Sequence, residues 1–237
     1  MKKLLILMGL LVFSCALPEN NLKHSKINPQ VIAYYAGDEK SIDEFNLTGV
    51  DQLIYSFLHL KGTKLSIDNE ADSLALLNVI AQKKKYPKLK VLVSLGGWGG
   101  CKTCSDAFST KEGRTDFAIS TAKIIDSYQA DGIDLDWEYP GISGFPGHKY
   151  LPEDRENFTE LVLELRKYMK KGDILSFAAG ANANDYFERS IEWDKVMPLV
   201  DNVNLMTYDF YGSSSSKTGH HTPLGSDEFK EGSVVSS

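Results

Sequence analysis

Acidic residues recur at alternate positions of one short apolar segment, which reads Asp131-Gly-Ile-Asp-Leu-Asp-Trp-Glu138. Alternate side chains of an extended strand point to the same face, so Asp134, Asp136 and Glu138 would form one row, with neighbours about 6–7 Å apart. Each negative charge in such a row raises the pKa of the others. The row therefore predicts proton-transfer chemistry or a bound cation. Calcium sites use flexible Gly- and Asn-rich turns, so the apolar, strand-like context favours proton transfer and no metal. We expect Asp131 to tie the start of the strand to its neighbours.

The segments that would position this row alternate between strand and helix patterns. Apolar runs predict six strands, over 31–36, 52–60, 90–96, 132–138, 175–181 and 202–210. Apolar residues at helical spacing predict helices before Lys83, over 117–128 and over 158–169, the last beginning near Pro152. Hydrophobic strands that alternate with helices indicate a parallel sheet covered by helices.

Two α/β architectures fit that alternation, an open doubly wound sheet and a closed (β/α)8 TIM barrel. The first strand is not followed by the Gly-x-Gly-x-x-Gly turn of dinucleotide-binding folds. Aromatic and acidic residues instead cluster at the carboxyl ends of several strands, which is how barrels build their sites. We therefore predict a TIM barrel, of which this chain holds about six of the eight βα units.

Composition restricts the class of protein. The 237 residues are 42% hydrophobic and carry a net charge of −6, which fits a globular domain with a sizeable core and argues against disorder. The sequence has no basic stripe, so nucleic-acid binding is not expected. We expect a monomer.

The N-terminus has the pattern of an export signal. Lys2 and Lys3 precede an apolar run that is too short to span a bilayer, and Ser14-Cys15-Ala16 follows. Ser14-Cys15 resembles a lipoprotein cleavage site with Cys15 as the lipidated residue, and plain secretion after cleavage at Ala16 is the alternative. We predict a signal over 1–16, a linker over 17–30 and a catalytic region over 31–237, in a bacterial protein that is secreted or lipid-anchored at the cell surface or outer membrane.

The two remaining cysteines form a Cys101-Lys-Thr-Cys104 segment. A redox motif or half of a zinc site would have the same spacing, but the sequence offers neither a thioredoxin-like context nor two further zinc ligands. We predict a small structural disulfide in a surface loop, as suits an exported chain.

Three motifs together resemble the family 18 glycoside hydrolases, the chitinase family. The acidic segment matches the Asp-x-x-Asp-x-Asp-x-Glu signature of that family, Ser94-Leu-Gly-Gly-Trp-Gly99 resembles its third-strand motif, and Met206-Thr-Tyr-Asp-Phe210 resembles its sixth-strand motif. The resemblance covers roughly residues 31 to 225. It implies two further βα units and a tryptophan at the end of an eighth strand. Neither is in this sequence, so we expect it to be the N-terminal part of a longer protein.

The resemblance also implies a mechanism and a set of site residues. Glu138 would be the general acid and base of a retaining hydrolysis in which the 2-acetamido group of the substrate is the nucleophile. Asp136 would hold the acetamido N–H, and Asp134 would share a proton with Asp136, which would let the cluster stay buried. Repulsion within the row would help to keep Glu138 protonated, and Tyr208 would orient the acetamido carbonyl. The implied contacts with chitin or chito-oligosaccharides are Tyr35, Phe57, Gly97, Trp98, Tyr139, Met206 and Asp209, with no cofactor. A lectin-like protein without turnover and an inactive truncated fragment are the alternatives.

Overall fold

The computed structural model describes residues 29–181, 186–212, 215–216 and 218–223, so the predicted signal, with Cys15, lies outside the described residues. Six parallel strands lie side by side in the order β1-β2-β4-β5-β6-β7. Their bounds are Ile32–Tyr35, Gln52–Lys61, Lys90–Gly96, Gly132–Asp136, Ile174–Gly180 and Asn202–Met206. The short strand β3 (Lys64–Ser66) pairs antiparallel with the end of β2 and lies off this path. All six predicted strands are therefore present, and β3 is one that the sequence pattern did not predict.

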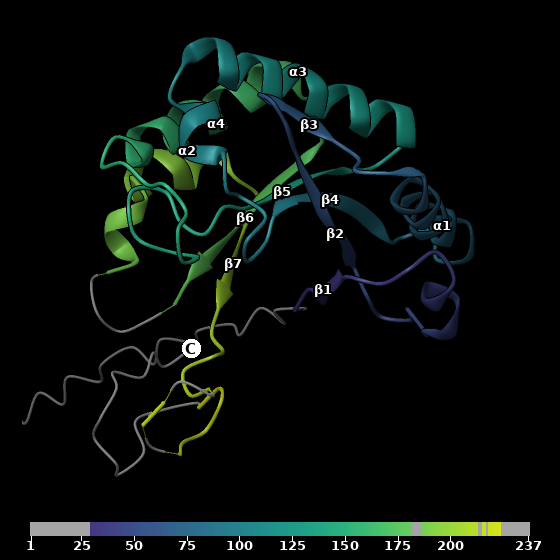
Figure 1. Cartoon of the computed structure of the whole chain (residues 1–237). Helices are drawn as coiled ribbons and strands as arrows, with labels where there is room; N and C mark the ends of the chain where they lie inside the picture. Colours follow the sequence, from purple (N-terminus) through teal and green to yellow (C-terminus); the bar gives the residue numbers. More distant parts are fainter. Residues whose placement is uncertain (1–28, 182–185, 213–214, 217, 224–237) are drawn as a thin grey trace, which may run out of the picture.

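The order of the strands decides between the two architectures. In a doubly wound sheet the strand order reverses at a switch point, whereas here each parallel strand pairs with the next one along the chain. The helices α1, α3 and α4 lie on one side of the sheet (Figure 1). The fold is the predicted TIM barrel, with six of the eight strands present among the described residues.

The helices match the sequence patterns closely. Helix α1 (Glu70–Lys85) is capped by Asn69, whose side chain accepts a hydrogen bond from Asp72 N. Its last turn holds three lysines, whose positive charges interact favourably with the negative end of the helix dipole. Helix α3 (Lys111–Tyr128) is capped in the same way by Thr110, and α4 (Asp154–Tyr168) begins two residues after Pro152. The shorter elements are η1 (Ser41–Glu44), α2 (Cys104–Phe108), η2 (Glu188–Ser190), α5 (Trp193–Val196) and η3 (Met197–Leu199).

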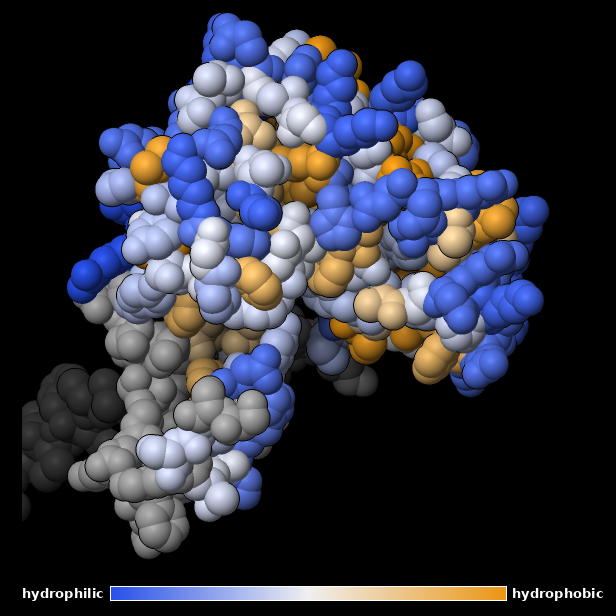
Figure 2. Space-filling model, in the orientation of Figure 1, coloured by the Kyte–Doolittle hydropathy of each residue, from blue (hydrophilic) through white to orange (hydrophobic). Residues whose placement is uncertain are grey.

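The two faces of the sheet differ in what they contact. Residues such as Val93, Leu135 and Phe177 belong to the hydrophobic core formed with the helices. The alternate residues face the barrel interior, where Ser94, Asp134, Ser176 and Asn202 occupy one row across β4, β5, β6 and β7. Hydrophilic side chains cover much of the visible outer surface, with apolar patches between them (Figure 2).

Aspartates tie the strands together at their amino-terminal ends. Asp131 Oδ2 accepts a hydrogen bond from Val91 N at 2.9 Å, and its carboxylate also meets the Nζ atoms of Lys83 at 2.7 Å and Lys90 at 3.1 Å. Asp51 and Asp201 make the same type of contact, to Val31 N at 2.8 Å and Leu175 N at 2.9 Å. Partial burial opposes ionisation of Asp131, but the hydrogen bonds from Lys83, Val91 and Lys90 outweigh it and lower its pKa. The structural role predicted for Asp131 is confirmed.

Candidate active site

The acidic row lies where β5 ends. Asp134 and Asp136 are the last inward-facing residues of the strand, but the strand stops at Asp136, so Glu138 stands in the segment that follows and not in the strand as predicted. Trp137, between Asp136 and Glu138, is 4% exposed and packs against the rings of Phe108 and Phe158 on the helical side of the sheet. The apolar residues of the segment thus anchor it, and they leave the acids on the interior side.

Asp134 is held by four hydrogen bonds from four strands. Its carboxyl group meets Ser176 Oγ at 2.6 Å, Ser94 Oγ at 2.9 Å, Tyr34 Oη at 3.0 Å and Asn204 Nδ2 at 3.1 Å. Complete burial raises its pKa, and the four hydrogen bonds partly oppose that rise. Asp134 therefore joins the strands at the centre of the barrel.

Asp136 has an acceptor atom with no partner. Its Oδ1 atom is buried and receives no hydrogen bond in the described part of the chain. Burial, followed by the charges of Glu138 and Asp134, raises the pKa of Asp136 to about 8. Asp134 and Asp136 are predicted to share a proton. The two carboxyl groups form no direct hydrogen bond with each other, because the four hydrogen bonds of Asp134 go to residues of the other strands. A buried acceptor without a partner is costly, and a donor from a ligand would satisfy it.

Glu138 has the environment of a general acid. It is 8% exposed, and burial is the first cause of its raised pKa. A hydrogen bond with the Tyr139 side chain opposes this rise, and the charge of Asp209 adds to it. The repulsion expected within the acidic row is present, because the charges of Glu138 and Asp136 oppose each other, and it contributes, after burial, to the raised pKa of Asp136. Burial is the first cause of the raised pKa of Glu138 itself.

The end of β7 brings a second group of residues to these acids. Tyr208 is half exposed, and its pKa is raised by burial and then by the charges of Asp136 and Glu138. Asp209 is exposed and has a φ of 60°, and its Oδ1 atom lies 3.4 Å from His221 Nε2. Met206 ends the strand and is partly buried.

Trp98 follows the end of β4, and Phe57 lies within the neighbouring strand β2. The indole of Trp98 is 59% exposed, the largest exposed fraction among the large hydrophobic residues that the structure describes. Gly97 has a φ of 76°, and a Cβ atom there would lie 2.6 Å from the Phe57 ring, so only glycine fits between that ring and the backbone. Gly97 N also donates to Asp136 O at 3.0 Å, which links this loop to β5.

Tyr35 does not face the interior. Its side chain is 7% exposed, belongs to the hydrophobic core and donates to Asp38 O at 2.7 Å. The adjacent Tyr34 faces the interior instead and bonds both Asp134 and Asn204. Successive residues of a strand point to opposite faces, so the predicted sugar contact at Tyr35 is the wrong one of two neighbouring tyrosines. Tyr139 lies beside the acids, because its side chain forms a hydrogen bond with Glu138, and its ring is 4.9 Å from that of Phe187.

The predicted disulfide between Cys101 and Cys104 is present. Its predicted place in a surface loop is wrong, since the two cysteines are 3% and 0% exposed. Cys101 Sγ lies 3.2 Å from the position that a Cβ atom on Gly96 would occupy. The bridge is thus packed beneath the loop that carries Trp98.

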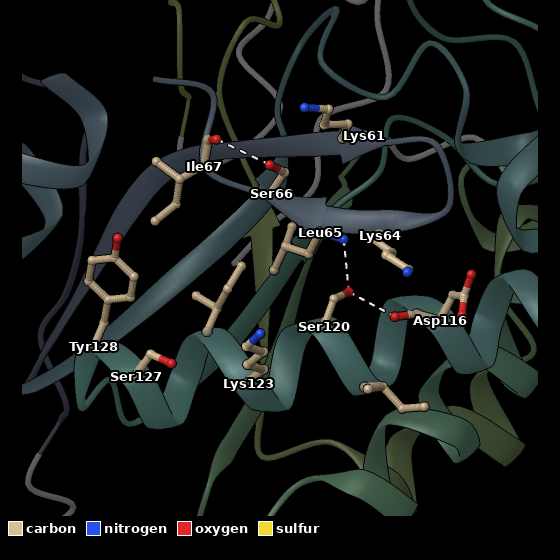
Figure 3. A pocket seen from close by; sticks show the side chains of 12 residues that line it. Lys61, Lys64, Leu65, Ser66, Ile67, Asp116, Ser120, Lys123, Ser127 and Tyr128 are labelled. Atoms are coloured by element: carbon tan, nitrogen blue, oxygen red, sulfur yellow. Dashed lines mark hydrogen bonds between the residues drawn. The ribbon is translucent and has the colours of Figure 1, made fainter. Parts of the chain in front are cut away.

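A separate groove of about 680 Å³ lies outside the barrel, between the β2–β3 hairpin and α3 (Figure 3). Leu65, Ser120 and Lys123 are among its lining residues, and Ser120 Oγ accepts from Leu65 N at 3.0 Å. None of the predicted site residues lines it. No group of three or more His, Cys, Asp or Glu residues suited to a metal ion occurs in the described residues, and no helix among them is long and apolar enough to cross a membrane.

Comparison with known proteins identifies the family. Residues 30–236 match the glycosyl hydrolases family 18. The chain belongs to this family. It is 36% identical to chitinase A1 of Niallia circulans over 61% of this chain and 22% of that protein. It is 33% identical to chitotriosidase-1 of Mus musculus over 73% of this chain and 38% of that one. The chain thus spans less than half the length of these two relatives.

Solved structures agree with this assignment. The chitinase domain of the spore coat protein CotE from Clostridium difficile has a TM-score of 0.78 and 34% identity, with 91% of this chain and 61% of that chain covered. A group II chitinase catalytic domain from Ostrinia furnacalis, solved with a chito-oligosaccharide, has a TM-score of 0.75 and 26% identity, with 84% and 56% covered.

Proposed function

We propose that the chain is the larger part of the catalytic domain of an exported chitinase that hydrolyses β-1,4 bonds between N-acetylglucosamine units. The observation that carries the proposal is the pair formed by Glu138, a buried acid with a raised pKa, and Asp136, whose buried Oδ1 atom has no partner among the described residues. The Glu138 carboxyl group can donate a proton to a glycosidic oxygen, and Asp136 Oδ1 can accept a hydrogen bond from an amide N–H. The chitinase names of the family 18 relatives support the same substrate class.

In the first step, Glu138 transfers its proton to the glycosidic oxygen while the acetamido oxygen of the substrate attacks the anomeric carbon. The bond to the leaving sugar breaks, an oxazolinium ion forms and Glu138 becomes a carboxylate. Glu138 then takes a proton from the incoming water, whose oxygen opens the oxazolinium ring. The acid is thereby regenerated and the configuration of the anomeric carbon is retained.

Asp136 assists the attack of the acetamido group. Its surroundings disfavour the ionised carboxylate until the bound substrate supplies a compensating positive charge. A pKa of about 8 keeps much of Asp136 protonated at neutral pH when no ligand is bound. The acetamido N–H, and the positive charge that develops on that group, favour the ionised carboxylate. The interaction is therefore strongest in the transition state, where it accelerates the reaction.

The remaining residues orient the sugar. Tyr208 lies beside Asp136 and Glu138 and would donate its hydroxyl to the acetamido carbonyl. The exposed indole of Trp98 suits stacking on the apolar face of a sugar ring, and Asp209 would contact the sugar beside the cleavage point. Asp134, held by four hydrogen bonds, fixes the position of β5 and so of Asp136.

The test uses the full-length protein and a fluorogenic chitobioside. Glu138→Gln keeps the shape of the side chain but has no acidic proton, so kcat should fall at least about 100-fold. Glu160→Gln is the matched control, because Glu160 is exposed on α4, and its activity should equal that of the wild type. Activity that survives Glu138→Gln would refute the mechanism. A wild type that retains chitin but releases no product would support the lectin-like alternative.

Export and lipid anchoring form a separate part of the proposal, supported by the Lys2-Lys3 pair, the apolar run and the Ser14-Cys15 site. The protein should incorporate labelled palmitate in a bacterial host, and Cys15→Ser should abolish the label. A label that persists in Cys15→Ser, or a wild type without label, would refute the anchor. The second result would leave plain secretion after Ala16.

A further inference from the structure

The loop that follows Glu138 folds back against the catalytic strand. A Cβ atom at Gly144 would lie only 2.1 Å from Glu138 O, so the loop backbone passes directly against the backbone of the catalytic acid. Tyr186 Oη donates to Ser143 O at 2.9 Å, and Lys149 pairs with Asp106. Contacts on both sides of residue 145 therefore fix the course of the loop.

Phe145, in the loop that follows Glu138, contacts the loop that carries Trp98. Its ring meets the Trp98 indole edge-on, with centroids 5.5 Å apart and planes at 66°. The ring also lies against Gly99, where a Cβ atom would be 3.2 Å from Phe145 Cε2. The ring of His148 lies 4.7 Å from that of Phe145. Phe145 is only partly exposed, whereas Trp98 keeps 59% of its surface open.

These contacts join the loop that carries the exposed indole to the backbone of Asp136 and to that of Glu138. Gly97 N, next to Trp98, donates to Asp136 O at 3.0 Å, and Gly144, next to Phe145, lies against Glu138 O. The contact between Trp98 and Phe145 completes this connection. An indole that stands mostly in solvent would otherwise lose rotamer freedom when it stacks on a ligand, and that loss weakens binding.

We propose that Phe145 is a positioning residue that holds the Trp98 indole ready to stack on a sugar ring and so strengthens the binding of chito-oligosaccharides. Phe145 acts through Trp98 and does not touch the reacting atoms. The inference rests on the proposed function, because it assigns a sugar to the indole. An edge-on aromatic pair of this kind corresponds to roughly a three- to tenfold change in affinity.

A double-mutant cycle tests the proposal, with KM and kcat for chitohexaose and the Kd of the same sugar in a Glu138→Gln background. Phe145→Ala should raise KM and Kd roughly three- to tenfold with kcat within about twofold, whereas Phe145→Tyr, which keeps the ring, should restore both. In a Trp98→Ala background, Phe145→Ala should have no further effect, because the residue it positions is gone. Phe45→Ala is the matched control, since Phe45 is a 55% exposed phenylalanine at the end of η1 and should leave both constants unchanged.

Either of two results would overturn the proposal. If Phe145→Ala weakened binding equally with and without Trp98, the role of Phe145 would be independent of the indole. If Phe145→Ala left KM and Kd unchanged, Phe145 would have no role in binding. In either case hydrolysis by the wild type, lost in Glu138→Gln, would leave the proposed function standing. A wild type that neither binds nor hydrolyses the hexamer would refute both.

Discussion

Tyr34 and Tyr35 offer a direct test of how the site is held together, because the two are adjacent in sequence and face opposite sides of β1. The Tyr34 hydroxyl lies 3.0 Å from Asp134 Oδ2 and 2.9 Å from Asn204 Nδ2, whereas the Tyr35 hydroxyl donates to Asp38 O at 2.7 Å. Tyr34→Phe and Tyr35→Phe each remove one oxygen atom. The chemical change is identical, and only the face of the strand differs.

The size of the effect follows from the partners of Asp134. Tyr34→Phe removes one of its four hydrogen bonds and also removes the hydroxyl that accepts from Asn204. A buried polar group that loses its partner costs about 1–3 kcal/mol. Asp134 keeps three partners, so the lower half of that range applies to the loss of stability. Because Asp134 also fixes the position of β5 and so of Asp136, we expect kcat/KM to fall about tenfold, which corresponds to about 1.4 kcal/mol. Tyr35→Phe should lower stability by about 1 kcal/mol and leave kcat/KM within about twofold.

The assay is kcat/KM for a fluorogenic chitobioside, with thermal unfolding of each variant measured in parallel. Stability separates the two roles, because a loss of activity that merely follows a lower Tm would occur in both variants. The reasoning would be refuted if Tyr34→Phe kept the wild-type kcat/KM, or if Tyr35→Phe lost as much activity as Tyr34→Phe.

Two further predictions concern the Trp98 loop and the pH dependence. Gly97→Ala should lower the Tm more than Gly49→Ala, because both glycines have positive φ, at 76° and 85°, but only a Cβ at Gly97 would meet another group, the Phe57 ring at 2.6 Å; equal losses would contradict this. Asp209→Asn should move the basic limb of the kcat/KM profile to lower pH, because the Asp209 charge raises the pKa of Glu138 and the acid step needs Glu138 protonated. A midpoint that stays in place or rises would count against this assignment.

The acidic strand could be predicted from sequence because its alternation is explicit. Three interleaved apolar residues, Ile133, Leu135 and Trp137, can only face the helices, and all three are at most 4% exposed. The parallel sheet likewise followed from the regular alternation of strands and helices, whose strands are apolar on the side that the helices cover. For the acidic strand, the pattern of apolar residues shows which face packs against the helices, and for the sheet as a whole the alternation shows that helices cover it.

The residues that hold Asp134 could not be predicted in the same way. The interior face of neighbouring strands also carries buried apolar residues, such as Ile54 and Leu92, so the sequence of β1 does not reveal which of its tyrosines points inward. The pairing of Ser94 and Ser176 with Asp134 depends on strand register, which becomes visible only in three dimensions. The missed strand β3 had a local signal, the turn at Gly62, which has a φ of 66°.

The proposed mechanism requires Glu138 and the acetamido group of the substrate to cleave the bond together, with retained configuration. The anomeric configuration of the first product, read by ¹H NMR within the first minutes of chitohexaose hydrolysis, reports on that requirement. The mechanism predicts that the β-anomer forms first and then mutarotates to the equilibrium mixture. An initial α-anomer would mean that water displaces the leaving sugar in one step, and it would contradict the proposed roles of Glu138 and Asp136.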